Sequence, residues 1–73
     1  MVDKQILNIQ KLCEHWASHN DKHVEGFKKW RDVAEQKGLK EIVSDLSKAI
    51  DMMNECTKYL LSARDELKRI SNK

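Results

Sequence analysis

Apolar residues recur along the first half of the chain at alternating steps of four and three, which is the spacing of one face of an α-helix. Asn20 and His23 fill the one gap in this series without breaking its register. The heptad therefore runs unbroken and predicts a single helix over about residues 3–36. Its a positions are Ile6, Cys13, Asn20, Phe27 and Ala34, and its d positions are Val2, Ile9, Trp16, His23 and Trp30.

The second half follows the same rule and predicts a helix over about residues 40–71. Its apolar stripe consists of Leu39, Ile42, Leu46, Ala49, Met53, Cys56, Leu60, Ala63, Leu67 and Ile70. Further apolar residues widen both stripes, namely Leu12, Val24 and Val33 in the first helix and Val43 and Ile50 in the second. A stripe this wide is typical of a bundle helix rather than of a two-stranded coiled coil.

The residues at the helix ends predict where the helices begin and stop. Asp3 precedes the first helix and can accept hydrogen bonds from the free N–H groups of its first turn. Gly38 is placed to adopt the left-handed conformation that ends a helix, with Leu39 folding back on Ala34 as in a Schellman motif. We therefore expect a turn at residues 37–39.

A turn this short requires the two helices to run antiparallel. The predicted fold is all-α, a single helical domain over residues 1–73 that forms a two-helix hairpin. Because a hairpin is one layer and cannot cover a broad apolar stripe alone, we expect a homodimer that forms a four-helix bundle, or a helical protein partner. A three-helix bundle with a break near Asn20-Asp21 is the alternative, since both residues can cap a new helix.

The interruption of the stripe gathers residues that bind metals. The antiparallel heptads place Asn20 opposite Cys56 and His23 opposite Met53, and His19 precedes His23 by one turn. Two histidines at i and i+4 can chelate one ion from a single helix. The predicted metal ligands are therefore His19, His23 and Cys56, with Met53 as a further candidate. Imidazole with thiolate suits zinc, nickel, cobalt or copper.

A structural interpretation explains the same residues. A polar residue at an a or d position fixes the register and the oligomeric state of a bundle at some loss of stability. Cysteine is also among the most buried residue types without doing any chemistry. We therefore favour an interaction module that requires no cofactor, and keep a transition-metal-binding protein as the alternative.

Gly26 is an unfavourable residue for the middle of a helix. Because helical side chains lean toward the N-terminus, we expect Trp30 to lie over Gly26, where a side chain would crowd the indole ring. Close approach of a second hairpin would explain this glycine equally well.

Composition disfavours several functional classes. Charged residues make up 36% of the chain and the formal net charge is +2, which gives no strong attraction to nucleic acid or to an anionic membrane. We see no membrane-spanning stretch and no export signal, so two cysteines indicate the reducing cytoplasm and free thiols. Cys56 and His23 could pair as thiolate and imidazole, but a regular helix offers no oxyanion donors. We therefore expect no enzymatic activity.

A longer motif resembles a known family. The chain reads HWxxHNxxH from His15 to His23, followed by Phe27, Trp30 and the Gly38-Leu39 pair. This pattern is similar to a family of small, uncharacterised prokaryotic helical domains, and the resemblance covers residues about 12–63. It implies an all-helical module whose histidine-rich half is a family feature, and it implies no reaction. Cys13 and Cys56 look peculiar to this sequence, so the resemblance does not support a thiolate ligand.

Overall fold

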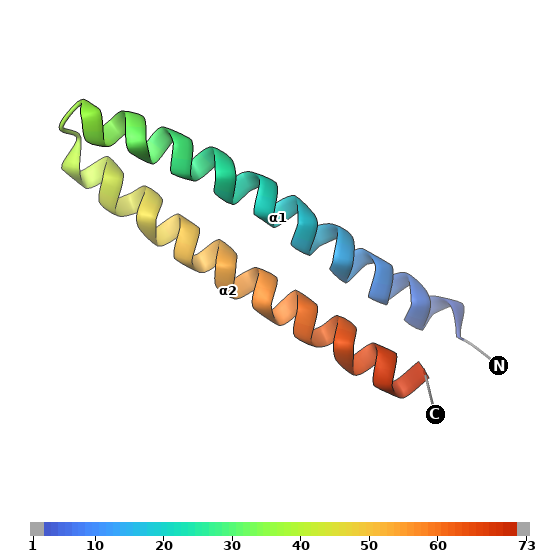
Figure 1. Cartoon of the computed structure of the whole chain (residues 1–73). Helices are drawn as coiled ribbons and strands as arrows, with labels where there is room; N and C mark the ends of the chain where they lie inside the picture. The colour runs from blue at the N-terminus through green and yellow to red at the C-terminus, as the bar shows by residue number, and fades with distance from the viewer. Residues whose placement is uncertain (1–2, 72–73) are drawn as a thin grey trace.

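Two long helices joined by a tight turn make up the computed structural model, which describes residues 3–71 (Figure 1). Helix α1 spans Lys4–Gln36 and helix α2 spans Lys40–Ser71. They lie side by side and antiparallel, so the start of α1 and the end of α2 share one end of the molecule. The predicted all-α hairpin is thus confirmed, and residues 3–71 contain no strand.

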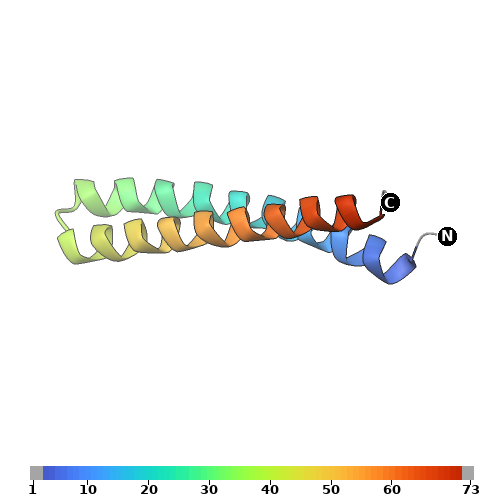
Figure 2. The same cartoon turned by 90° about the horizontal axis from the view of Figure 1, so that it is seen from below.

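Helix α1 continues without a break through Asn20 and Asp21. The three-helix alternative is therefore wrong, and the heptad that runs through this region was the better guide. Near the termini, α2 passes in front of α1 when the hairpin is seen from below, so the two helices cross at a shallow angle (Figure 2). The hairpin is a rod whose Cα atoms extend over 57 × 14 × 12 Å.

The predicted signals at the helix ends are present. Asp3 caps α1, because its Oδ1 accepts hydrogen bonds from the backbone N–H groups of Gln5 at 2.8 Å and Ile6 at 3.4 Å. At the other end, Gly38 has φ 73°, and the N–H of Leu39 donates to the carbonyl of Ala34 at 3.0 Å. Together with a bond from the Gly38 N–H to the preceding turn, this is the Schellman pattern.

The contact between the helices is a seam of side chains that alternate at steps of three and four, and all of its members are buried or half-buried. On α1 the seam consists of Ile6, Gln10, Cys13, Ala17, Asn20, Val24, Phe27, Arg31 and Ala34. On α2 it consists of Val43, Leu46, Ile50, Met53, Thr57, Leu60, Arg64, Leu67 and Ser71. Nine of the nineteen described residues that were predicted to pack between the helices belong to this seam.

The other residues of the predicted stripe, as far as they are described, lie outside this seam, so the prediction is wrong for them. Ile9, Trp16, His23 and Trp30, expected at d positions, are exposed, and Val2 lies outside the described residues. On α2, the exposed residues of the predicted stripe include Ile42, Cys56, Ala63 and Ile70. Each helix is rotated by about 50° relative to the predicted heptad, given 3.6 residues per turn. A single neighbouring helix can cover only one side of a stripe that is wider than a two-helix seam.

The rotation brings polar side chains into the seam in place of the predicted d residues. Gln10 and Thr57 each have a buried side-chain oxygen without a hydrogen-bond partner within the described residues. The described residues contain only five buried side chains of hydrophobic type, and none of the large side chains is fully enclosed. The interior of the hairpin is therefore small: Cys13, Ala17, Val24, Ala34 and Ile50.

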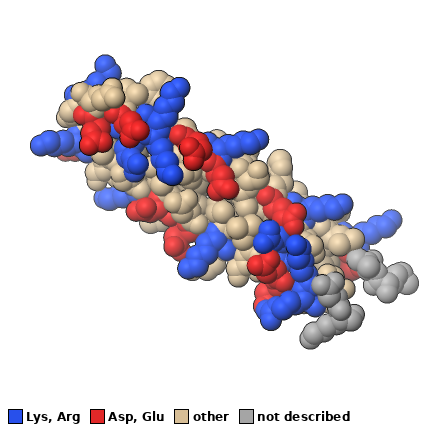
Figure 3. Space-filling view, viewed as in Figure 1, with Lys and Arg blue, Asp and Glu red and all other residues tan. Residues whose placement is uncertain are grey.

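Charged side chains of both signs are interspersed along the whole length of the rod on the face shown in Figure 3. No large area of one sign dominates this view. Within residues 3–71, neither helix has an apolar segment long enough to cross a membrane.

Replacing Gly38 with alanine tests the Schellman turn. The φ of 73° is strained for a residue with a Cβ, so Gly38→Ala should lower the free energy of unfolding by about 1–2 kcal/mol. Gly38→Asn is the matched control, because asparagine tolerates the left-handed conformation better. Chemical denaturation of the three proteins at one concentration measures the difference. Equal stabilities for all three would contradict a left-handed turn residue.

Candidate functional site

One face of the hairpin carries most of the apolar surface that the seam leaves uncovered. A two-fold axis perpendicular to the plane of the two antiparallel helices exchanges one helix with the other. Residues that precede a seam residue by one position in either helix therefore lie on the same side of that plane. The residues that directly precede alternate seam positions therefore share one face. We call these residues the apolar face: Ile9, Trp16, His23 and Trp30 of α1, and Ile42, Ala49, Cys56, Ala63 and Ile70 of α2.

The large hydrophobic side chains of this face are well exposed in the hairpin. The exposed fraction is 60% for Trp30, 46% for Trp16 and 54% for Ile70. Three more exposed hydrophobic residues, Leu12, Met52 and Tyr59, lie on the same side of the hairpin, next to the apolar face and farther from the seam. Isolated exposed hydrophobic residues are ordinary on protein surfaces, whereas a continuous set on one side of a rod is not.

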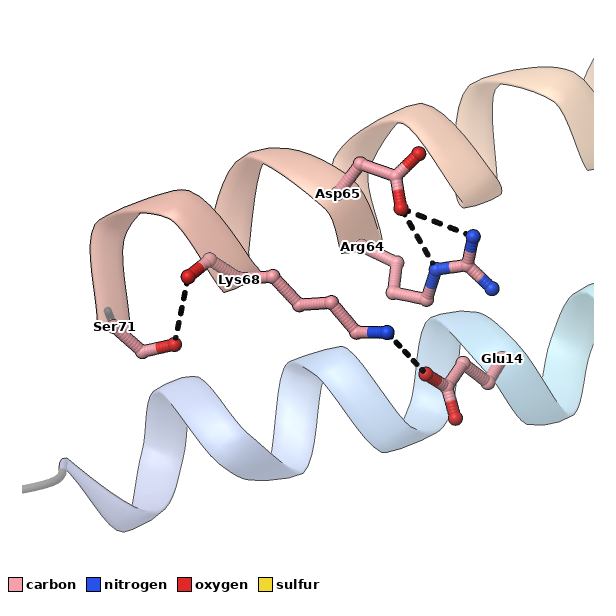
Figure 4. Close-up of polar contacts among 5 residues, drawn as sticks. All are labelled: Glu14, Arg64, Asp65, Lys68 and Ser71. Carbon is pink, nitrogen blue, oxygen red and sulfur yellow. Dashed lines mark hydrogen bonds and ion pairs between the residues drawn. The ribbon is translucent and has the colours of Figure 1, made fainter.

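The opposite face is polar. Lys68 reaches across from α2 to Glu14 on α1, with Nζ and Oε1 3.9 Å apart and both side chains about half exposed (Figure 4). Beside it, Arg64 forms an ion pair with Asp65 at 3.0 Å, and the Ser71 hydroxyl donates to the Lys68 carbonyl at 3.2 Å. Exposed ion pairs of this kind add little stability. They do show that the side away from the apolar face is suited to water.

Gly26 also lies beside the apolar face, next to the row that His23 and Trp30 form along α1 and farther from the seam. The expectation that Trp30 covers Gly26 is wrong, because a Cβ built on this glycine would have no atom within 4 Å apart from its own helix backbone and chain neighbours. No contact within the hairpin therefore explains a glycine at this position.

The three histidines form a row along α1 at intervals of one turn. The Nε2 atoms of His19 and His23 are 3.0 Å apart, and their rings meet edge to face with centroids at 4.5 Å. The His15 and His19 rings are farther apart, at 6.2 Å. All three side chains are exposed. The i, i+4 spacing thus brings one pair, His19 and His23, to hydrogen-bonding distance.

Asn20 and Cys56 meet across the seam as predicted. The Asn20 side-chain amide donates a hydrogen bond to the Cys56 Sγ at 3.4 Å. Asn20 is half-buried, whereas Cys56 is exposed at the edge of the apolar face. This contact lies near the midpoint of both helices, where a polar pair can set the register of one helix against the other.

The predicted metal ligands are only partly brought together. His19 and His23 are adjacent, but Cys56 is engaged with Asn20 and Met53 is half-buried in the seam. His23 does not face Met53 in the interior, since its side chain is exposed. Among residues 3–71 of one chain, no three His, Cys, Asp or Glu side chains are grouped so as to hold a metal ion. Cys13 and Cys56 are both free thiols.

A family model described as a domain of unknown function, DUF8180, matches residues 9–67. The chain belongs to this family. The DUF8180 match includes both halves of the hairpin, the turn at Gly38, the His19–His23 pair and the Asn20–Cys56 contact. It agrees with the expected membership of an uncharacterised family, while the HWxxHNxxH motif as the mark of that family stays a prediction. No curated protein and no solved structure matches the chain.

Replacing Asn20 with leucine tests the role of the Asn20–Cys56 contact. If this pair mainly sets the register, Asn20→Leu should raise the melting temperature and loosen the choice of oligomeric state. Ser18→Leu is the control, because Ser18 is exposed and gains the same helix propensity. Circular dichroism melts and light scattering measure the two effects. A lower melting temperature for Asn20→Leu than for the control would show that the contact stabilises the fold.

Proposed function

We propose that this DUF8180 domain is a helical interaction module without catalytic activity of its own, and that it pairs with a second copy through the apolar face. The observation that carries this proposal is the concentration of exposed tryptophan and isoleucine side chains on one side of the hairpin. A two-helix layer of this length buries too little apolar surface to be stable on its own, and a second layer is the usual remedy.

The size of the face suits a second copy. The extents of 57 × 14 Å give a projected area of roughly 800 Å², which is about what each partner contributes to an interface of standard size. Two such faces form a four-helix bundle, in which every helix contacts two neighbours. The predicted a and d stripe of each helix points between the seam and the apolar face, toward the centre of this bundle.

The composition of the face also favours self-association. On α1 it presents the large rings of Trp16 and Trp30, whereas on α2 it presents the small side chains of Ala49, Cys56 and Ala63. A two-fold arrangement that sets α1 of one copy over α2 of the other places large side chains against small ones. Alternation of large and small residues across facing positions is how bundle interiors fill without voids.

Trp30→Glu tests the pairing. A charge buried within the interface should convert a dimer at micromolar concentration into a monomer, as measured by light scattering. Because Trp30 is 60% exposed in the hairpin, its side chain buries little there, and any loss of helix content should come from the loss of the second copy. Ser18→Glu adds the same charge away from the face and should leave the dimer intact.

The dimer also predicts that the melting temperature of the wild-type chain rises with protein concentration. This measurement keeps the test valid if Trp30→Glu unfolds. A folded wild-type monomer with a concentration-independent melting temperature would contradict a second copy. It would favour a different helical protein as the partner.

Gly26→Ala provides an independent test at the edge of the face. In an isolated hairpin, alanine should raise the free energy of unfolding by about 1 kcal/mol, since it meets no other atom and favours the helix. If a second copy approaches the backbone here, the same change should weaken dimerisation. Sedimentation equilibrium gives the dissociation constant for both proteins. Equal or tighter dimerisation of Gly26→Ala would mean that the interface does not include Gly26.

Binding of a transition metal is a second candidate function, and the contact between the Nε2 atoms of His19 and His23 favours it. Zinc, nickel, cobalt and copper all accept imidazole ligands. Cys56 and Met53 would extend the site only if their side chains left their present positions. Metal that stays with untagged protein through gel filtration and dialysis would support this function.

A further inference from the structure

The His19–His23 pair has the geometry of half a metal site. Zinc lies about 2.0–2.1 Å from each imidazole nitrogen in a tetrahedral centre, so two such nitrogens are roughly 3.3 Å apart. The two Nε2 atoms are 3.0 Å apart, close to this spacing. Both side chains are exposed, so an ion can reach them.

One chain cannot complete this site as it stands. A structural zinc ion takes four ligands, and the hairpin offers two at this place. No third His, Cys, Asp or Glu side chain joins the pair within residues 3–71. The missing ligands must therefore come from water or from another molecule.

The position of the pair along the rod decides which molecule can supply them. His23 lies on the apolar face and His19 lies at its outer edge, and both are close to the midpoint of α1. Cys56 lies at the same level, because it contacts Asn20. When two hairpins pair over their full length, the middle of one lies against the middle of the other, whichever way the second copy runs.

We infer that His19 and His23 form one half of a transition-metal site that a second copy of the chain completes. This inference rests on the proposed pairing through the apolar face. The second copy supplies either its own histidine pair or its Cys56, because these are the nitrogen and sulfur ligands it carries at this level. Copies whose α1 helices face each other bring four imidazoles together, and copies that set α1 against α2 bring the thiol to the pair.

Metal binding here changes the hydrogen bonding of the pair. At 3.0 Å one Nε2 donates a proton and the other accepts it. A metal needs the lone pairs of both Nε2 atoms, so the donor imidazole must carry its proton on Nδ1 instead, and the metal replaces the hydrogen bond between the two rings. Acid competes with the metal for the same nitrogens, and affinity should therefore fall as the pH is lowered.

Zinc binding to untagged, full-length protein tests the inference, with zinc chloride as the probe and native mass spectrometry as the readout. We expect zinc on the dimer and none retained on the monomer. One zinc ion per two chains would indicate four imidazoles, and one per chain would indicate the histidine pair with the partner's thiol. Cys56→Ser should leave binding unchanged in the first case and weaken it at least tenfold in the second.

Three variants locate the site. His19→Ala and His23→Ala should each weaken zinc binding at least tenfold, and His15→Ala is the matched control that should retain it. Trp30→Glu, which separates the copies, should weaken zinc binding as much as loss of one histidine. Unchanged binding by Trp30→Glu monomers, equal loss in His15→Ala, or no binding by the wild-type dimer would each overturn the inference.

The mass of the protein in EDTA separates this inference from the proposed function. A dimer that persists in EDTA but retains no zinc when zinc is added would overturn the metal site and leave the pairing intact. A monomer both in EDTA and with zinc would overturn both.

Discussion

Each helix of the hairpin can press only one narrow strip of its surface against the other, and the chain carries more apolar surface than this strip holds. The seam buries small side chains such as Ala17, Val24 and Ala34. The tryptophans are left on the side, where only another molecule can cover them. The exposed apolar face, the weak interior and the placement of the histidines all follow from this geometric limit.

Local features of the fold could be predicted from the sequence because they depend on a few neighbouring residues. Asp3 caps the first helix and Gly38 ends it, since a carboxylate acceptor and a left-handed turn each require a particular residue type. The heptad also showed that α1 is continuous. The rotation of each helix about its axis could not be predicted. The apolar stripe of each helix is three rows of residues wide, and any two neighbouring rows have the three-and-four spacing of a seam, so the spacing does not show which two rows face the other helix. Gln10 and Thr57 gave no signal, since they are polar residues in a seam that was expected to be apolar.

The candidate site divides in the same way. The His19–His23 contact follows from their spacing on one helix, and the Asn20–Cys56 contact follows from the pairing level, which the turn determines. The prediction that Cys56 and the histidines bind one metal ion required His23 to face the interior of the hairpin. Whether it does so depends on the rotation of the helix about its axis, which the sequence does not determine. The contacts that one helix or one level determines were therefore predictable, and those that need the orientation of both helices were not.

The tight turn at Gly38 gives the folding of the hairpin a direction. Contacts beside the turn join residues that are close in sequence, whereas Asn20 and Cys56 at mid-length are 36 positions apart and Glu14 and Lys68 enclose a longer stretch. Because the entropy lost on closing a loop grows with its length, we expect the helices to meet first beside Gly38 and to close progressively toward the open end. Opening should proceed in reverse, so amide protons should exchange fastest near Lys4 and Ser71 and slowest where Val24 and Ile50 are buried.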